Sequence, residues 1–126
     1  MSTIKANTLL HSDGSTTTQP SIPALDKRMA KAWVNFNGTG TVAIRSSYNV
    51  SSLSDVGTGD YIINFTVSMP SVNFCTLGGM GANDGETLSY RGGTGQNTVS
   101  RVRVAHKNLS NAYVDGSLIS VAVLSS

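Results

Sequence analysis

Charge is scarce in this chain: only 13% of its 126 residues are Asp, Glu, Lys or Arg, about half the share in an average soluble domain. Aromatic residues are also few, at 6%. No apolar run reaches the roughly 18 residues of a membrane span, and the N-terminal segment lacks the hydrophobic core of a signal peptide. We therefore expect a protein that is made in the cytoplasm and does not insert into a membrane.

Cysteine is almost absent, because Cys75 is the only one and His11 and His106 are the only histidines. A lone cysteine excludes an internal disulfide, and these residues are too few for a cysteine-rich zinc site. We expect Cys75, which follows Phe74, to be a small buried or half-buried apolar residue. No metal site or cofactor is predicted, although a calcium site at a turn stays open because turn carboxylates are its usual ligands.

Small residues take the place of charge. The chain holds 18 serines, 13 threonines, 10 asparagines and 13 glycines, together 54 of its 126 residues. These residues favour turns and strands over helices, because Ser and Asn compete for backbone hydrogen bonds and Gly loses the most conformational entropy. The length fits one domain with a short arm.

From about residue 31 onward, apolar and polar residues alternate with the period of a β-strand. In the clearest stretch the odd positions are all apolar: Tyr61, Ile63, Phe65, Val67 and Met69. This predicts a strand with one buried face. Weaker alternations occur at 32–36, 42–44, 72–74, 88–90, 102–104 and 119–123, with turn-forming residues at 37–38, 57–60, 78–79, 84–85, 92–93 and 115–116. About seven or eight such strands predict an all-β fold, an antiparallel β-sandwich over residues 31–126.

The first thirty residues differ from the rest and predict an N-terminal arm that serves attachment or trimerisation. Ile22, Leu25 and Met29 are spaced to lie along one helical stripe, and Pro23 stands where a first helical turn tolerates proline. This favours one short helix. A helix of this length is marginal in water, so it needs a partner surface, either the following domain or the same segment of another subunit.

Groups suited to catalysis do not converge in the sequence. His106 shares a strand face with Val102 and Val104, which indicates a histidine near a strand end or a subunit contact. A polysaccharide-degrading enzyme needs two carboxylates about 5 to 9 Å apart in a cleft, whereas the acids of residues 33–126 occur in or near glycine-containing turns. We therefore expect a protein that is not an enzyme.

Charge is distributed unevenly, with a net −3 over residues 33–86 and +3 over residues 87–126. Arg101, Arg103 and Lys107 lie on the strand face opposite Val102 and Val104. Three interpretations of these basic residues stay open. They are a solvated outer face, a contact with the acidic segment of another subunit, or a surface that binds an anionic glycan or lipopolysaccharide. Nucleic acid is not expected, because aromatic residues do not interleave with these charges.

One block of the sequence points to a family. It begins with residues 32–45, AWVNFNGTGTVAIR, and continues through 48–52, 57–61, 64–65 and 69–70. This block resembles a module of tail-fibre and related structural proteins of bacteriophages, notably marine and cyanobacterial ones. Residues 119–123 resemble its last strand, and residues 2–9 are similar to a lead segment that often precedes such modules. Residues 75–111 match least, and the equivalent region of fibre proteins tends to vary.

The resemblance implies a virion component, a homotrimer with β-rich protomers around a threefold axis, in contact with other phage structural proteins. The leading hypothesis is a non-enzymatic tail fibre or fibre tip that presents the loops at 78–84 and 90–97 to a host-surface glycan. The candidate receptor-binding residues are Tyr90, Arg91, Asn83 and Asn97, and the candidate subunit contacts are Ile22, Leu25, Met29, Arg101 and Arg103. Tyr90 and Arg91 are expected to stack on and hydrogen-bond to a sugar. The alternative is a capsid decoration or connector protein whose arm grips neighbouring subunits.

Overall fold

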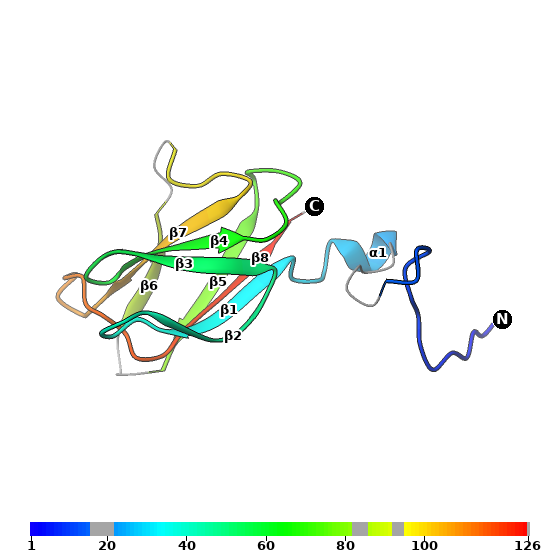
Figure 1. Ribbon diagram of the computed structural model, residues 1–126, viewed down its shortest axis with the longest axis horizontal. Coiled ribbons are helices and arrows are strands. Elements are labelled where there is room, and N and C mark those ends of the chain that lie inside the picture. The colour runs from blue at the N-terminus through cyan, green and yellow to red at the C-terminus, as the bar shows by residue number, and fades with distance from the viewer. Residues whose placement is uncertain (16–21, 82–85, 92–94, 126) are drawn as a thin grey trace.

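The computed structural model describes residues 1–15, 22–81, 86–91 and 95–125. Two antiparallel four-stranded sheets pack against each other (Figure 1), which confirms the predicted all-β sandwich. In spatial order, sheet A contains β2 (Ala43–Tyr48), β1 (Ala32–Asn37), β8 (Ile119–Leu124) and β5 (Cys75–Met80), and sheet B contains β3 (Val50–Gly57), β4 (Asp60–Phe65), β7 (Arg101–Lys107) and β6 (Thr87–Tyr90).

The core lies between the sheets and is built by strand alternation. Every second residue of β1, β4, β7 and β8 points inward, because successive side chains of a strand face opposite sides of the sheet. The buried apolar residues of this core are Ala32, Val34, Phe36, Tyr61, Ile63, Phe65, Met69, Val102, Val104, Ile119, Val121 and Val123, and Ala105 of β7 is buried as well. The period of two in the sequence therefore identified most of the inner face of the sandwich.

Val67 departs from the predicted strand, which was expected to continue to Met69. β4 ends at Phe65, and Val67 is 67% exposed, while Met69 returns to the core. The cause is the side chain of Asn49, whose Oδ1 accepts a hydrogen bond from Val67 N at 2.7 Å and whose Nδ2 donates to Val67 O at 3.0 Å and to Lys31 O at 2.9 Å. Asn49 has a φ of 54°, in the left-handed region that asparagine tolerates better than most residues.

The edge strand β5 differs from expectation in two ways. Gly78 and Gly79 lie inside the strand instead of in a turn, because they pair with Val121 and Ser120 of β8. Cys75 is exposed, not buried or half-buried as expected. It begins β5, which lies at the edge of the sheet, so no strand covers it on its outer side. Residues 72–74 form no strand.

The arm stands off one end of the sandwich (Figure 1). Its helix, α1 (Pro23–Asp26), is only four residues long, shorter than the stripe predicted. Ile22, Leu25 and Met29 are 38%, 43% and 41% exposed, so the sandwich does not cover this stripe. None of the helical segments among the described residues has the length and apolarity to cross a membrane.

Candidate functional site

An ion pair joins two neighbouring strands on the outer face of sheet B. Asp60 begins β4, and Arg103 stands on the outward side of β7, since Val102 and Val104 point into the core. The guanidinium of Arg103 donates from Nε to Asp60 Oδ1 at 2.7 Å and from Nη2 to Asp60 Oδ2 at 2.6 Å. A planar fork of donors matched to both carboxylate oxygens is the strongest form of this interaction. It fixes both side chains in place.

Arg91, which follows β6, joins the same carboxylate. Its Nη1 donates to Asp60 Oδ2 at 2.6 Å. Asn97 holds the backbone of both arginines, because its Nδ2 donates to Arg91 O at 2.6 Å and its Oδ1 accepts from Arg103 N at 2.8 Å. Gln96 Oε1 accepts a further hydrogen bond from Arg103 Nη1. The two arginines are thus positioned by side chains from a strand and a loop.

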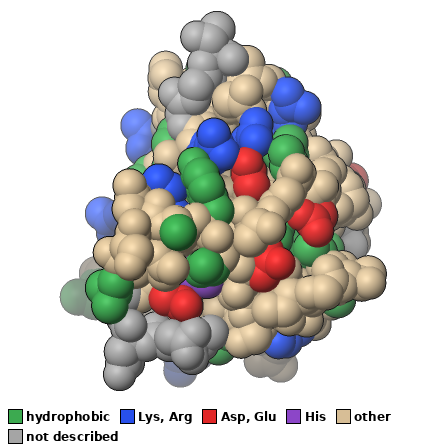
Figure 2. All heavy atoms as spheres, turned by 90° about the vertical axis from the view of Figure 1, so that its left-hand side faces the viewer, with side chains coloured by type: hydrophobic (Ala, Val, Ile, Leu, Met, Phe, Trp, Pro, Cys, Tyr) green, Lys and Arg blue, Asp and Glu red, His purple; other side chains and the backbone are tan. Residues whose placement is uncertain are grey.

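The ring of Tyr113 lies beside Arg91 and beside a third cation, Lys107. The ring centroid is 5.3 Å from the guanidinium carbon of Arg91 and 4.8 Å from Lys107 Nζ. Cation–π contacts of this length are attractive, so the ring holds Arg91 and Lys107 on the surface. Figure 2 shows basic and acidic side chains lying side by side on the end of the sandwich that points away from the arm.

These seven residues are called the Asp60 cluster below: Asp60, Arg91, Gln96, Asn97, Arg103, Lys107 and Tyr113. Hydrogen bonding from Arg103, with the charges of Arg103 and Arg91, holds the pKa of Asp60 below its ordinary value despite the opposing effect of burial. The same hydrogen bond raises the pKa of Arg103. The cluster itself therefore carries three positive charges and one negative charge at neutral pH.

A buried tyrosine anchors the β4 end of the cluster. Tyr61 follows Asp60 and is fully buried, and its hydroxyl lies 3.1 Å from both Gly38 O and Asp115 Oδ1. Asp115 Oδ1 also accepts a hydrogen bond from Gly59 N at 2.7 Å. Burial, followed by the hydrogen bond to Asp115, raises the pKa of Tyr61. The network ties the turn before β4 to the connection between β7 and β8.

Two of the four predicted receptor-binding residues, Arg91 and Asn97, belong to the Asp60 cluster. Tyr90 lies on the other side of the sheet, because its register partner on β7 is the inward-facing Val104. Its ring packs edge-on against Phe74 at a centroid distance of 6.5 Å and is 47% exposed. Tyr90 and Arg91 therefore do not converge on one sugar. Asn83 lies outside the described residues.

Of the predicted subunit contacts on β7, Arg103 has its acidic partner within the same chain. Its side chain is 16% exposed and is bound to Asp60. Asp60 belongs to the acidic segment, residues 33–86, that was expected to contact the basic residues of another subunit. Arg101 donates from Nη2 to Gly95 O at 2.9 Å. The sequence did not predict Tyr113 and Gln96 as site residues, because no local pattern indicates that a loop residue will lie beside a distant strand.

His106 is fully buried on the inner side of β7, as its alternation with Val102 and Val104 predicted. Its Nε2 lies 3.0 Å from Glu86 Oε2. A Cβ at Gly116 would lie 2.6 Å from His106 Nδ1, so glycine is required there for the imidazole to fit. No three His, Cys, Asp or Glu side chains of the described residues gather as a metal site would require.

The fold defines the class as a two-layer antiparallel β-sandwich with an N-terminal arm. No protein-family model matches the chain, and no curated protein or solved structure matches it. Because one fold hosts many functions, function is inferred from the chemistry of the Asp60 cluster and from the sequence resemblance described above.

Proposed function

We propose that this chain is a non-enzymatic structural protein of a bacteriophage virion, a tail fibre or fibre tip that binds a glycan of the host surface. Support comes from the fibre-like block of residues 32–70 and from a surface that has fixed cations and one aromatic ring. The observation that carries the binding site is Tyr113, whose ring lies beside both Arg91 and Lys107.

The chemistry of the cluster favours an acidic glycan. Asp60 neutralises one of three positive charges, and Arg91 uses only Nη1 toward Asp60, while Lys107 Nζ donates to Asn111 Oδ1 at 3.0 Å. Both cations thus keep donors for a carboxylate or phosphate group. Such groups pair well with guanidinium and ammonium donors, and holding the cations in place lowers the ordering cost of binding.

The protein is proposed to act as a homotrimer together with other phage structural proteins. The exposed stripe of Ile22, Leu25 and Met29 supports this, because such residues are stabilised when another subunit covers them. A closed threefold assembly also presents three copies of the Asp60 cluster to one cell surface, which raises avidity without new contacts.

A capsid decoration or connector protein is the second candidate. The observation that favours it is the arm, in which Ile4, Leu9 and Leu10 are 88%, 66% and 49% exposed. An extended arm with uncovered apolar residues suits a protein that grips its neighbours in a shell, where those residues become buried.

Electron microscopy of purified phage particles labelled with an antibody against this chain separates these possibilities. Gold particles at the ends of tail fibres are the expected result. Labelling over the capsid shell would favour the decoration or connector protein instead. Particles that carry no label, although the phage genome encodes the chain, would contradict both virion proposals.

A further inference from the structure

The outer face of sheet A is uncharged in its two central rows, unlike the outer face of sheet B. Strand pairing places four residues side by side in each row: Tyr48, Trp33, Ala122 and Leu77 in the first, and Ser46, Asn35, Ser120 and Gly79 in the second. Outward-facing strand positions of a sandwich are ordinarily polar and often charged. The first row therefore has the composition of a covered surface, while the second row is polar but uncharged.

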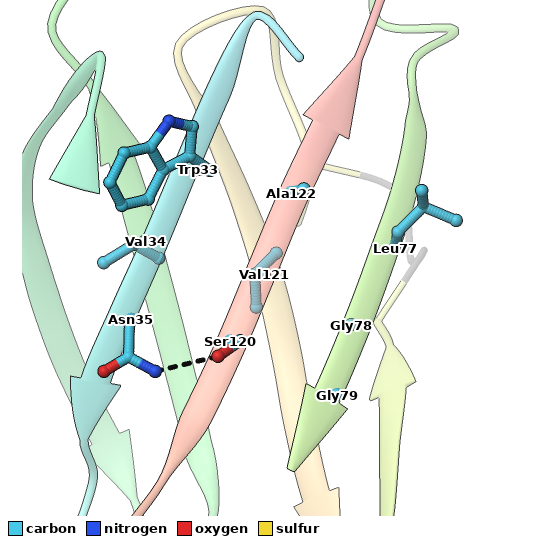
Figure 3. A pocket seen from close by; sticks show the side chains of 9 residues that line it. All are labelled: Trp33, Val34, Asn35, Leu77, Gly78, Gly79, Ser120, Val121 and Ala122. Carbon is cyan, nitrogen blue, oxygen red and sulfur yellow. Dashed lines mark hydrogen bonds between the residues drawn. The ribbon is translucent and has the colours of Figure 1, made fainter. Parts of the chain in front are cut away.

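A groove of about 320 Å³ runs along β8 between β1 and β5. Figure 3 shows Trp33 and Asn35 of β1 on one side of it, Leu77 and Gly79 of β5 on the other, and Ser120 and Ala122 of β8 between them. Asn35 Nδ2 donates to Ser120 Oγ at 2.8 Å, so the polar groups of the groove already bind each other.

The large side chains of the first row are strongly exposed in the single chain. Trp33 is 39% exposed, Tyr48 44% and Leu77 56%. Interfaces between proteins are enriched in tryptophan and tyrosine and depleted of charge at their centre. A row of this kind across four strands resembles the centre of an interface more than a solvated sheet surface.

We propose that this face of sheet A, together with the apolar stripe of the arm, is the contact between copies of this chain. The inference rests on the oligomer in the proposed function and names its interface. A charged partner would lose hydration against this face without gaining a counter-charge, so an uncharged surface fits it best. Another copy supplies such a surface.

Size and position also connect the face with the arm. Four strands of six residues cover roughly 20 Å in each direction, or roughly 400 Å², about half of the roughly 800 Å² that each partner contributes to a standard interface. The arm enters sheet A at the start of β1, next to Trp33, where Lys31 N donates to Val123 O at 2.7 Å. Leu25 and Met29 therefore lie close along the chain to the uncharged rows.

Gly79→Arg tests the inference within the intact chain. A Cβ at position 79 would meet nothing within 4 Å, so the variant is expected to fold while it places a bulky charge in the groove. Trp33 is the only tryptophan, and its fluorescence reports burial of the face directly. Sedimentation and emission spectra are measured at micromolar concentration, with Ser68→Arg, an exposed loop change, as the matched control.

We expect the wild type and Ser68→Arg to sediment as an oligomer with blue-shifted Trp33 emission that moves to the red on dilution. Gly79→Arg is expected to sediment as a folded monomer with red-shifted emission and unchanged circular dichroism. Thiol labelling gives a second readout, because Cys75 is exposed on the same edge strand as Leu77. Maleimide is expected to label it severalfold faster in Gly79→Arg than in the wild type.

Three results would overturn the inference. A Gly79→Arg oligomer with wild-type emission and labelling would remove this face from the contact, while the oligomer itself would stand. A wild type that is monomeric would overturn the oligomer as well. A monomeric wild type whose Trp33 emission shifts on addition of dextran, an uncharged glucose polymer, would assign the groove to a neutral sugar instead.

Discussion

Arg103 donates two hydrogen bonds to Asp60, at 2.7 and 2.6 Å, and so joins the outer sides of β7 and β4. Both side chains are largely withdrawn from water, with 16% and 11% of their surfaces exposed. Because Arg91 shares the same carboxylate, this pair sets the geometry of the whole Asp60 cluster. Stability and binding are therefore linked at one residue.

Asp60→Asn is expected to lower the free energy of unfolding by about 2 kcal/mol, because it removes charge-assisted hydrogen bonds and leaves Arg103 without its counter-charge. Urea unfolding at neutral pH measures the loss. The matched control, Asp55→Asn, changes an exposed acid on β3 and is expected to cost about 0.5 kcal/mol or less. Equal midpoints for the two variants would show that the ion pair contributes nothing.

The same pair predicts a pH dependence. The pKa of Asp60 is lowered in the folded chain, so its stabilising effect is complete above the ordinary aspartate value of about 3.9 and is lost as the pH falls through the lowered folded value. The difference in unfolding free energy between wild type and Asp60→Asn is expected to narrow in that acid range. A difference that stays constant down to pH about 2 would be inconsistent with the lowered pKa.

Tyr61→Phe tests the buried network beneath the cluster. The change removes the hydroxyl that lies 3.1 Å from Gly38 O and from Asp115 Oδ1, and with it the single proton that these two acceptors share. We expect a loss of about 1 to 2 kcal/mol in unfolding free energy, measured by thermal and urea denaturation. Tyr90→Phe, at a half-exposed ring, serves as the control and is expected to unfold like the wild type.

Tyr113 is expected to act through its ring. Tyr113→Phe keeps the face that holds Arg91 and Lys107 and should bind host cells like the wild type. Tyr113→Ala frees both cations and should weaken binding by about tenfold, the size of a cation–π contribution of about 1.4 kcal/mol. Flow cytometry with labelled protein measures both. If the two variants lose binding equally, the hydroxyl and not the ring is the important group.

Much of the sandwich was predictable because burial imposes a period of two. Tyr61, Ile63 and Phe65 lie on the inner face as expected, since a shift of one residue would bury polar groups. Gly78 and Gly79 were misassigned because turn preference is local, whereas pairing with β8 decides their structure. The length of the helix was also overestimated. The spacing of apolar residues shows which side chains can share a helical face, but it does not show which surface covers them.

The candidate site was less predictable than the fold. Alternation placed Arg103 on the outward side of β7, but its partner Asp60 lies 43 positions earlier and becomes adjacent only because β4 and β7 pair. Tyr113 comes from the connection between β7 and β8, where no periodic pattern exists. Tyr90 and Arg91 were treated as one loop pair, yet the end of β6 directs them to opposite sides of the sheet.

Competition for host attachment tests the central proposal most directly. Host cells are incubated with the purified protein, and the adsorption rate of the phage that encodes it is then measured. We predict that the wild type slows adsorption, that a variant with both Arg91→Ala and Tyr113→Ala does not, and that Ser68→Arg acts like the wild type. Unchanged adsorption in the presence of excess wild-type protein would contradict a receptor-binding role.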